Sequence, residues 1–585
     1  MKTVALVSLD GNIDFMCFPD FDSPTVFASL LDKENGGNFT VVPQFKAYKT
    51  KQLYIPGTAI LLTRFFSDEG ITELTDYMPL EDSAENSICA IVRKIKTIRG
   101  RVTYKVNCAP RFDYAKADHH IEKSGKQEMT FTAINDGDTM VRLIADFNLK
   151  TAGRDGVAEF THEEGGESWI VLESVKTGDT DNLRAIDFYK GATYGETVDY
   201  WRKWISKSTY TGRWGDLIFR SAITLKLLTS ATHGSMVAAP TFSLPESIGD
   251  ERNWDYRFTW IRDAAFTMYA FLRLGFWEEA SAFLRWIHER SGDEVLNLMY
   301  TIDGSPIPKE KVLKNLEGYM GSGPVRIGNA AKDQHQLDIY GELIDTIYLY
   351  NKNHSKINYE FWQTVEKHMS CVVKDWEKPD HGIWEFRSGK KHFLHTRLMC
   401  WVAVDRAIKI ATDRSFPYPE AEWKKVRDEI YHDIYEGFWN EKLGAWVQHK
   451  GADAVDASVL LMPLVHFITA DEPRWVSTMK VIEEKLSTDV LIYRYDNKGD
   501  LDGLSGEEGT FNMCSFWFIE ALAKNKEVDK ALEYFEKMVG YANHLGLFSE
   551  QIGKRGEHLG NFPQAFTHLA LISAALELDK QLDRL

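Results

Sequence analysis

The sequence predicts a multidomain α and β protein, with an N-terminal antiparallel β-sandwich followed by a barrel of paired helices. The 585 residues are enough for two or more domains. The hydrophobic period changes near residue 193, from about two residues before it to about 3.6 after it. Long loops punctuate the helical part, which is typical of helical hairpins with a site at one end.

Residues 1–192 are expected to form the β-sandwich. Short segments rich in β-branched residues recur there and are separated by clusters of Gly, Asp and Asn; examples are SICAIVRKIKTI, RVTYKVNCA, EMTFTAI, TMVRLIADF and SWIVLESV. Many short strands between turn signals favour a sandwich over a parallel sheet. Residues 193–211, which include TYGETVDYWRKWISKS, are predicted to be a helical linker.

Residues 212–585 are expected to form the helical barrel. Amphipathic stretches recur at 218–228, 262–273, 277–290, 336–350, 396–411, 457–467, 509–523 and 565–578. Gly275 stands where a helix end favours a left-handed residue. At about 30 residues for each helix and its loop, this part holds about twelve helices. No sequence repeat is evident, and a helical solenoid is the alternative architecture.

The composition excludes some classes of partner. The 69 Lys and Arg residues against 86 Asp and Glu residues give a net charge of −17, and no basic cluster is present. Binding to nucleic acid or to an anionic membrane is therefore not expected. Aromatic residues make up 13% of the chain, which suits a ligand with flat apolar faces such as a sugar ring.

The six cysteines are scattered and form no Cys-x-x-Cys pair, so neither a disulfide scaffold nor a structural zinc site is predicted. The N-terminal apolar stretch is interrupted at Ser8 and Asp10, and no run approaches the roughly 20 apolar residues of a membrane helix. A cytoplasmic protein is expected, and a homo-oligomer is compatible with the sequence.

Several kinds of chemistry lack their motif. Gly321-Ser322-Gly323 begins like a dinucleotide fingerprint, but position 326 is Arg and no strand–turn–helix pattern precedes it. No Gly-x-Ser-x-Gly elbow is present. His381, His392 and His395 lack a carboxylate at metal-ligand spacing, so polar loop histidines are the ordinary interpretation. The sequence predicts no cofactor and no metal.

Two glutamates stand out as candidates for acid and base chemistry. Glu385 lies between Trp384 and Phe386, and an apolar wall disfavours the charged carboxylate, as a general acid at neutral pH requires. The positive charge of Arg387 is expected to have the opposite effect and to favour the charged carboxylate of Glu385. Glu550 has polar neighbours, Ser549 and Gln551, which suit a carboxylate that stays ionised and takes a proton from water.

The loop 250–263 is dense in side chains that bind hydroxyl groups. Arg262 and Asp263, at a helix start, could hold vicinal hydroxyls, while Trp254, Tyr256 and Trp260 offer stacking faces. A helix start with a structural ion pair explains the same spacing.

Six runs then resemble glycoside hydrolase family 15, the group of glucoamylases, trehalases and glucodextranases. They are APTFSLPESIGDERNWDYRFTWIRDAAF (239–266), PVRIGNAAKDQHQLDIYGE (324–342), HGIWEFR (381–387), FLHTRLMCWVAVDRA (393–407), GEEGTFNMCSFWFIEAL (506–522) and LGNFPQAFTHLALISAA (559–575). The opening run ALVSLDGNIDFMCFPDFDSPTVFASLLD (5–32) is similar to the N-terminal domain of the trehalase-like branch. The motifs occur in order over nearly the whole chain.

The resemblance implies a β-sandwich followed by an (α/α)6 barrel and inverting hydrolysis of an α-glucosidic bond at the non-reducing end. It assigns Glu385 as the general acid and Glu550 as the base. Arg262 and Asp263 match the glucose-binding pair, with Trp254, Tyr256, Trp260, Trp384 and Arg387 as further binding residues. Inversion predicts that the two carboxyl groups lie about 6.5–9.5 Å apart.

Two departures from the family pattern concern the leaving group. Phe386 replaces a second glutamate of the fungal secreted enzymes, and Arg397 stands where many relatives have Lys. The leading functional prediction is an exo-acting hydrolase that releases β-D-glucose from short α-glucosides, and the alternative is a trehalase. A phosphorylase and a non-catalytic regulatory homologue are the other readings; the presence of both Glu385 and Glu550 disfavours them.

Overall fold

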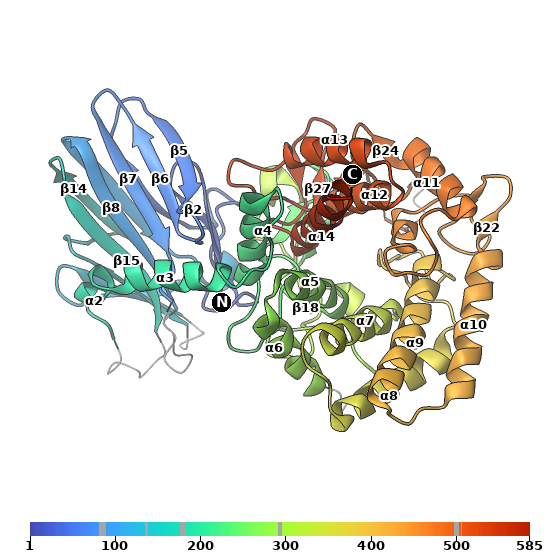
Figure 1. The fold of residues 1–585 in the computed structure, drawn as a ribbon. Helices are drawn as coiled ribbons and strands as arrows, with labels where there is room; N and C mark the ends of the chain where they lie inside the picture. The colour runs from blue at the N-terminus through green and yellow to red at the C-terminus, as the bar shows by residue number, and fades with distance from the viewer. Residues whose placement is uncertain are drawn as a thin grey trace. The chain divides into compact units, whose positions relative to one another are not determined.

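The chain forms two compact units in a computed structural model that describes residues 1–80, 89–134, 139–175, 183–290, 295–496, 502–504 and 506–584 (Figure 1). The first unit comprises Met1–Lys207, Lys226–Thr232 and Val312–Val325. The second comprises Ser208–Leu225, His233–Lys311 and Arg326–Leu585. The predicted order of a β part followed by a helical part is confirmed. The segment Val312–Val325 belongs to the first unit although it interrupts the helical part of the sequence.

The first unit is built from two antiparallel sheets. One has the order β1-β2-β4-β9-β14-β13, with β3 paired to β2, and the other has the order β10-β11-β12-β15-β8-β7-β6-β5. The strands are β1 (Ala5–Val7), β2 (Ile13–Cys17), β3 (Thr25–Phe27), β4 (Asn38–Pro43), β5 (Lys49–Tyr54), β6 (Leu61–Phe66), β7 (Gly70–Tyr77), β8 (Ala90–Gly100), β9 (Val102–Ala109), β10 (His119–Lys123), β11 (Glu128–Ala133), β12 (Met140–Ala145), β13 (Lys150–Ala152), β14 (Asp155–His162) and β15 (Glu167–Val175). Its helices are α1 (Phe112–Ala115), α2 (Ile186–Lys190) and α3 (Thr193–Ile205).

Alternation along the strands explains why the two sheets pack face to face. Strands β4 and β11 alternate strictly between buried and half-buried positions. The inward side chains of both sheets join in one core, which includes Val41 and Val106 from one sheet and Leu74, Ile95 and Leu143 from the other. A period of two with one apolar face is what a sandwich requires.

The second unit is mainly helical. Its helices, together with α4 that continues into the first unit, are α4 (Gly215–Leu227), α5 (Ile261–Leu274), α6 (Trp277–His288), α7 (Asp338–Asn353), α8 (Tyr359–Asp375), α9 (Leu394–Arg414), α10 (Glu420–Gly437), α11 (Pro473–Leu486), α12 (Asn512–Lys524), α13 (Val528–Val539) and α14 (Ala565–Leu582). The 3₁₀ helices are η2 (Tyr319–Gly321), in the segment that joins the first unit, and η3 (Ala330–Asp333) and η4 (Ala457–Leu461). Short strand pairs occupy the loops: β16 (Phe242–Pro245), β17 (Asn253–Asp255), β18 (Thr259–Trp260), β19 (Met299–Tyr300), β20 (Lys311–Leu313), β21 (Val325–Ile327), β22 (Trp439–Asn440), β23 (Ala445–Trp446), β24 (Ser487–Thr488), β25 (Leu491–Ile492), β26 (Thr510–Phe511), β27 (Gln551–Ile552) and β28 (His558–Leu559).

The helices of the second unit close into a ring (Figure 1). Contacts run from α5 to α7, α9, η4, α12, α14 and back to α5. Helices α6, α8, α10, α11 and α13 pack outside this ring, each against an inner neighbour. The inner helices are buried on nearly all sides, whereas an outer helix such as α8 buries one stripe. A closed ring excludes the solenoid, and the 3₁₀ helix η4 occupies the sixth inner position.

Gly341 allows α7 and α9 to approach closely, so Gly341→Ala is expected to destabilise the ring. A Cβ atom at this position would lie 2.1 Å from the carbonyl oxygen of Met399, which is backbone and cannot rotate away. We expect the free energy of unfolding to fall by about 1–3 kcal/mol, the usual cost of overpacking. At Gly437, at the end of outer helix α10, a Cβ atom would meet the side-chain ends of Lys450 at 3.5 Å and Asp433 at 3.7 Å, which is ordinary contact, so Gly437→Ala serves as the control. Urea unfolding of both variants measures the difference, and equal stabilities would contradict the close approach.

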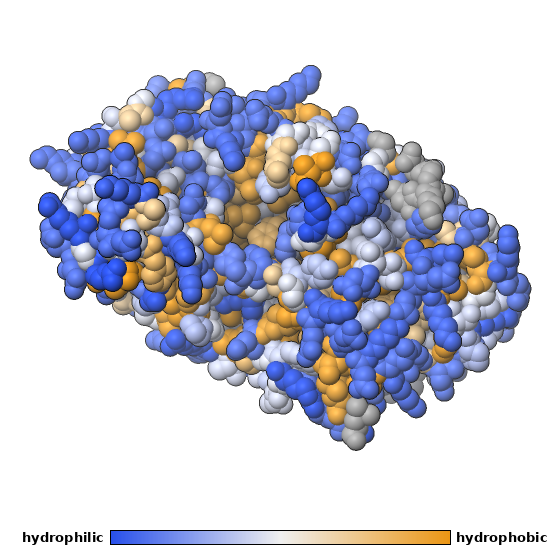
Figure 2. Space-filling view, turned by 90° about the horizontal axis from the view of Figure 1, so that it is seen from above, coloured by the Kyte–Doolittle hydropathy of each residue, from blue (hydrophilic) through white to orange (hydrophobic). Residues whose placement is uncertain are grey.

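Hydrophilic residues cover most of the face drawn in Figure 2, and hydrophobic residues lie between them in smaller areas. The large hydrophobic side chains that are exposed are spread along the chain, for example Leu9, Val295, Met320 and Tyr359. Across the described part of the chain, no helix is both long and apolar enough to cross a membrane.

Candidate active site

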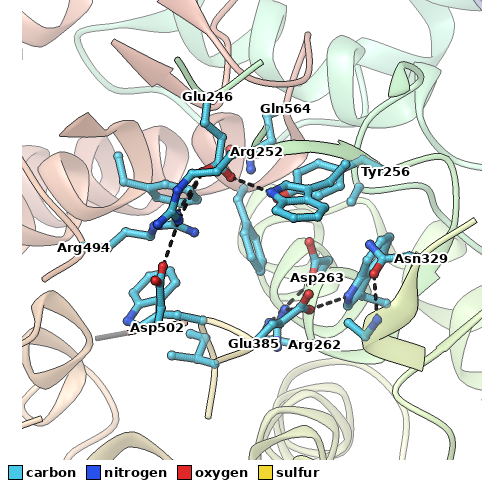
Figure 3. A pocket seen from close by; sticks show the side chains of 18 of the residues that line it. Glu246, Arg252, Tyr256, Arg262, Asp263, Asn329, Glu385, Arg494, Asp502 and Gln564 are labelled. Atoms are coloured by element: carbon cyan, nitrogen blue, oxygen red, sulfur yellow. Dashed lines mark hydrogen bonds and ion pairs between the residues drawn. The ribbon is translucent and has the colours of Figure 1, made fainter. Parts of the chain in front are cut away.

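A pocket lies within the second unit, where loops lead into the N-terminal ends of the inner helices. It opens to solvent, and the space inside it out to its mouth is about 740 Å³. The lining includes eight of the nine residues predicted from the sequence: Trp254, Tyr256, Trp260, Arg262, Asp263, Trp384, Glu385 and Arg387. The ninth, Glu550, does not line the pocket but contacts a residue that does. Figure 3 shows Glu385, Arg262 and Asp263 on one side and Glu246, Arg252, Arg494 and Asp502 on another.

Glu385 is held in a strained backbone conformation at the pocket wall. Its φ of 60° lies in the left-handed region, which costs a residue with a side chain about 1–3 kcal/mol. Its amide donates to the carbonyl of Gly382 at 3.2 Å, and its own carbonyl accepts from the Gln334 side chain at 3.0 Å. Strain that the surroundings hold in place is typical of functional positions.

One oxygen of the Glu385 carboxyl group is fixed by two donors. The indole nitrogen of Trp260 donates to Oε1 at 2.9 Å, and Nη2 of Arg262 donates to the same atom at 3.3 Å. Oε2 takes part in neither bond. The side chain is 24% exposed, so this carboxyl group can meet a ligand in the pocket while its orientation is set from one side.

The arginine that donates to Glu385 is Arg262, and the effect of Arg387 on this carboxyl group stays a prediction. The guanidinium of Arg387 lies 4.3 Å above the ring of Trp254, and its Nη2 lies 3.7 Å from Glu310. Helix α5 begins immediately before Arg262 and turns it towards Glu385, a contact across 123 residues that adjacency in sequence does not reveal.

Arg262 and Asp263 form a buried pair in the pocket lining. Nε of Arg262 lies 3.6 Å from Oδ2 of Asp263, and Nη1 donates to Oε1 of Gln336 at 2.8 Å. Burial raises the pKa of Asp263 to about 7 although the positive charge of Arg262 lowers it. The pair therefore offers a guanidinium donor and a carboxyl acceptor side by side, which suits two adjacent hydroxyl groups.

Glu550 is almost fully buried and directly precedes β27, which pairs with β26 and β28. The hydroxyl of Tyr256 donates to Oε1 at 2.7 Å, and the amide of Asn561 donates to Oε2 at 3.3 Å. Gly560 lies against this carboxyl group, where a Cβ atom would stand 2.4 Å from Oε2. Tyr256 itself lines the pocket, so Glu550 is linked to the pocket through that hydroxyl.

The sequence neighbours of Glu550 are not its partners, contrary to the prediction. The hydroxyl of Ser549 donates to the carbonyl of Gln551, and the side chain of Gln551 accepts from the amide of Gly509. Burial raises the pKa of Glu550 to about 8, and the negative charge of Glu246 adds to this, which opposes the predicted ionised state. The hydrogen bond from Tyr256 lowers the pKa and favours the ionised form.

A buried ionic network forms the far side of the pocket, and its residues are not among the nine predicted from the sequence. Arg494 contacts Glu246 at 3.2 Å and also Glu508, and Nη1 of Arg252 donates to Asp502 at 2.8 Å. Glu246 also accepts from the indole nitrogen of Trp254 at 3.2 Å and so fixes that ring. The signal in the sequence is weak, because the partners lie far apart in the chain; Arg494 meets Glu246 across 248 residues.

Aromatic side chains complete the lining. The ring of Tyr256 meets Trp260 edge to face at 5.6 Å, and Trp384 meets Phe511 in the same way at 5.5 Å. The indole nitrogen of Trp384 donates to Asp456 at 2.9 Å. Rings held in this way present fixed apolar faces between polar groups, as the binding of a sugar requires.

The pattern of these residues agrees with known families. Residues 212–576 match the family described as glycosyl hydrolases family 15, and residues 1–188 match the family described as trehalase-like, N-terminal. The chain belongs to family 15 of the glycosyl hydrolases. The resemblance and the enzyme class predicted from the sequence are confirmed, whereas the separate roles of Glu385 and Glu550 stay predictions.

Relatives of this family 15 chain match it over nearly all of its length. A protein of Thermoplasma acidophilum named trehalase is 38% identical over 583 residues, which cover 98% of each chain. A protein of Mycobacterium tuberculosis, also named trehalase, is 34% identical over 607 residues, covering 99% of this chain and 88% of its own. A solved bacterial glucoamylase in complex with acarbose has a TM-score of 0.73 and 14% identity, and covers 98% of this chain and 91% of its own. At this identity the last likeness shows the fold, an N-terminal β part with a family 15 helical barrel.

Proposed function

We propose that this family 15 enzyme hydrolyses α,α-trehalose to two molecules of glucose. The observation that carries the proposal is the similarity to proteins named trehalase over 98% of both chains, which includes the β part as well as the barrel. The leading prediction from the sequence is a broader exo-acting α-glucosidase, and the relatives favour the alternative stated with it. The polar groups on both sides of the pocket support a substrate whose two halves are both glucose.

In this proposal Glu385 is the general acid. Because Trp260 and Arg262 both donate to Oε1, the proton is carried on Oε2, the oxygen that these donors leave available. The proton passes from Oε2 to the glycosidic oxygen as the bond between that oxygen and the anomeric carbon breaks. The departing glucose leaves as a neutral alcohol.

Glu550 is the general base in the same step. It takes a proton from a water molecule whose oxygen forms the new bond to the anomeric carbon, so one bond forms as one breaks. Tyr256 and Asn561 orient the carboxylate through one hydrogen bond to each oxygen, and each oxygen keeps a lone pair for water. The reaction balances with water alone and requires no phosphate. Arg262 and Asp263 hold the hydroxyls of the glucose under attack.

The test is glucose release from trehalose, maltose and isomaltose by the purified full-length chain, in phosphate-free buffer and in buffer with phosphate. We expect trehalose to be cleaved at least about 100-fold faster, in kcat/KM, than either other disaccharide, with no dependence on phosphate. Comparable rates on maltose would support the prediction of a broader α-glucosidase instead. Sugar phosphate as the product would instead establish a phosphorylase.

The pH dependence of kcat/KM reports the ionisation of the proposed base. Activity rises with pH as Glu550 loses its proton, so a variant with a lower pKa at Glu550 becomes active at lower pH. Glu246→Gln removes a negative charge that raises this pKa, and we expect the acidic limb to move to lower pH. Tyr256→Phe removes the hydrogen bond that lowers the pKa, and we expect the limb to move to higher pH. Shifts of both variants in one direction would count against Glu550 as the base.

A further inference from the structure

A second group of ionisable side chains lies behind the pocket and plays no part in the proposed reaction. Asp338 and Glu342 stand one turn apart on α7, and His395 stands on the adjacent helix α9. All three are at most 2% exposed. One potential ligand atom from each lies within 4.8 Å of the others, and none of the three lines the pocket.

The polar atoms of this group have no hydrogen-bond partner in the described part of the chain. By hydrogen-bond geometry this holds for both carboxylate oxygens of Asp338 and Glu342 and for both ring nitrogens of His395. The backbone amides of Asp338 and Ile339, at the start of α7, favour the charged form of Asp338. His395 faces Asp338 through Nδ1 at 3.7 Å and Glu342 through Nε2 at 3.8 Å, distances beyond a direct hydrogen bond. Buried polar groups are nearly always paired, so six such atoms in one place indicate a ligand.

The charge around the group is also unbalanced. Asp338 interacts electrostatically with the carboxyl groups of Asp263, Glu342 and Glu385. Arg262 is a cation that interacts with all four of these carboxyl groups. Arg262 lies 3.8 Å from Asp338, while its two terminal nitrogens donate to Gln336 and Glu385. Asp380, which also acts on Asp338, adds a further carboxyl group. A buried site with this excess of acidic groups is balanced either by protons or by a bound cation.

The geometry favours the cation. Residues four apart on a helix project from one face, so Asp338 and Glu342 present their carboxylates together. The close approach of α7 and α9 at Gly341 brings His395 opposite them. His395 faces both carboxylates from α9, and an imidazole nitrogen is a common metal ligand. Two carboxylates with one imidazole are ligands for divalent first-row metals such as Mn²⁺ and Zn²⁺.

We propose that Asp338, Glu342 and His395 bind one divalent transition-metal cation, Mn²⁺ or Zn²⁺, that holds α7 to α9 behind the pocket. The cation is structural, because its ligands do not reach the pocket. This proposal departs from the sequence-based prediction of no metal, and it does not depend on the proposed trehalase activity. In the sequence, His395 was grouped only with His381 and His392. The spacing of four residues between Asp338 and Glu342, on one face of a helix, is the signal that indicates the proposed site.

The test uses the full-length chain, stripped with a chelator and then dialysed against Mn²⁺ or Zn²⁺, with the bound metal measured by mass spectrometry. We expect about one equivalent of metal per chain and a higher Tm with metal than without it. Glu342→Gln and His395→Gln are each expected to weaken binding at least about 100-fold. His368→Gln is the matched control, because His368 is also buried with both ring nitrogens unpartnered but belongs to no such cluster among the residues that the structure describes.

Two outcomes would overturn the proposal, and a further measurement applies if a variant does not fold. If the stripped wild type takes up neither metal and its Tm is unchanged by both, the proposal is wrong and the carboxyl groups are balanced by protons. Uptake that Glu342→Gln and His395→Gln retain in full would also overturn it, because the metal would then be bound elsewhere. If either variant does not fold, spectroscopy of the metal bound to the wild type decides, by pulsed electron paramagnetic resonance for Mn²⁺ or X-ray absorption for Zn²⁺. An imidazole nitrogen bound to the metal supports the site, and its absence for the metal that is taken up contradicts it.

Discussion

Glu385→Gln is expected to lower kcat on trehalose by about 10³-fold or more, because the glycosidic oxygen then leaves without a proton. Glutamine keeps an oxygen that can accept from Trp260 and Arg262, so the side chain should stay in place while its acid function is lost. On α-D-glucosyl fluoride, whose leaving group needs little protonation, the loss should be less than about 10²-fold. Steady-state kinetics on both substrates measure the contrast.

The control is Glu507→Gln, which makes the same chemical change at an exposed glutamate paired with Lys554 and should leave both rates unchanged. Equal losses on trehalose and on the fluoride would contradict the assignment of Glu385 as the acid. In that case the residue would bind substrate without transferring a proton.

Glu550→Gln is expected to lower kcat by a similar factor, about 10³-fold or more, but equally on trehalose and on α-D-glucosyl fluoride. Both substrates need an activated water, whatever their leaving group. KM should change little, because Glu550 does not line the pocket. Rapid-quench and steady-state measurements on the two substrates distinguish this pattern from that of Glu385→Gln. Retention of fluoride hydrolysis would show that another group activates water, and Glu246, which lines the pocket, would be the next candidate.

The barrel could be predicted from the sequence because its signals are local. The helix that starts at Ile261 ends at Gly275, whose φ of 90° is the left-handed conformation predicted for that glycine. The strands of the first unit show the alternation that a half-buried sheet imposes. The inclusion of Val312–Val325 in the first unit was not predictable, because it depends on contacts between distant segments and not on any local period.

The site shows the same division between local and distant signals. Trp254, Tyr256, Trp260, Arg262 and Asp263 lie within one run of ten residues, and all five line the pocket. The partner of each candidate glutamate was not predictable: Arg262 reaches Glu385 across 123 residues, and Tyr256 reaches Glu550 across 294. Likewise, Arg494 and Glu246 meet across 248 residues, so neither could be recognised as part of the pocket from its own neighbours.

The central claim is that Glu385 and Glu550 act together as acid and base on trehalose. Its most direct test is to measure the anomeric form of the glucose that is released first. Water attacks one anomeric carbon of trehalose and the other half departs with its own configuration unchanged. Proton NMR in the first moments of the reaction should therefore show α- and β-glucose in equal amounts. Release of α-glucose alone would require a retaining mechanism and would contradict the account.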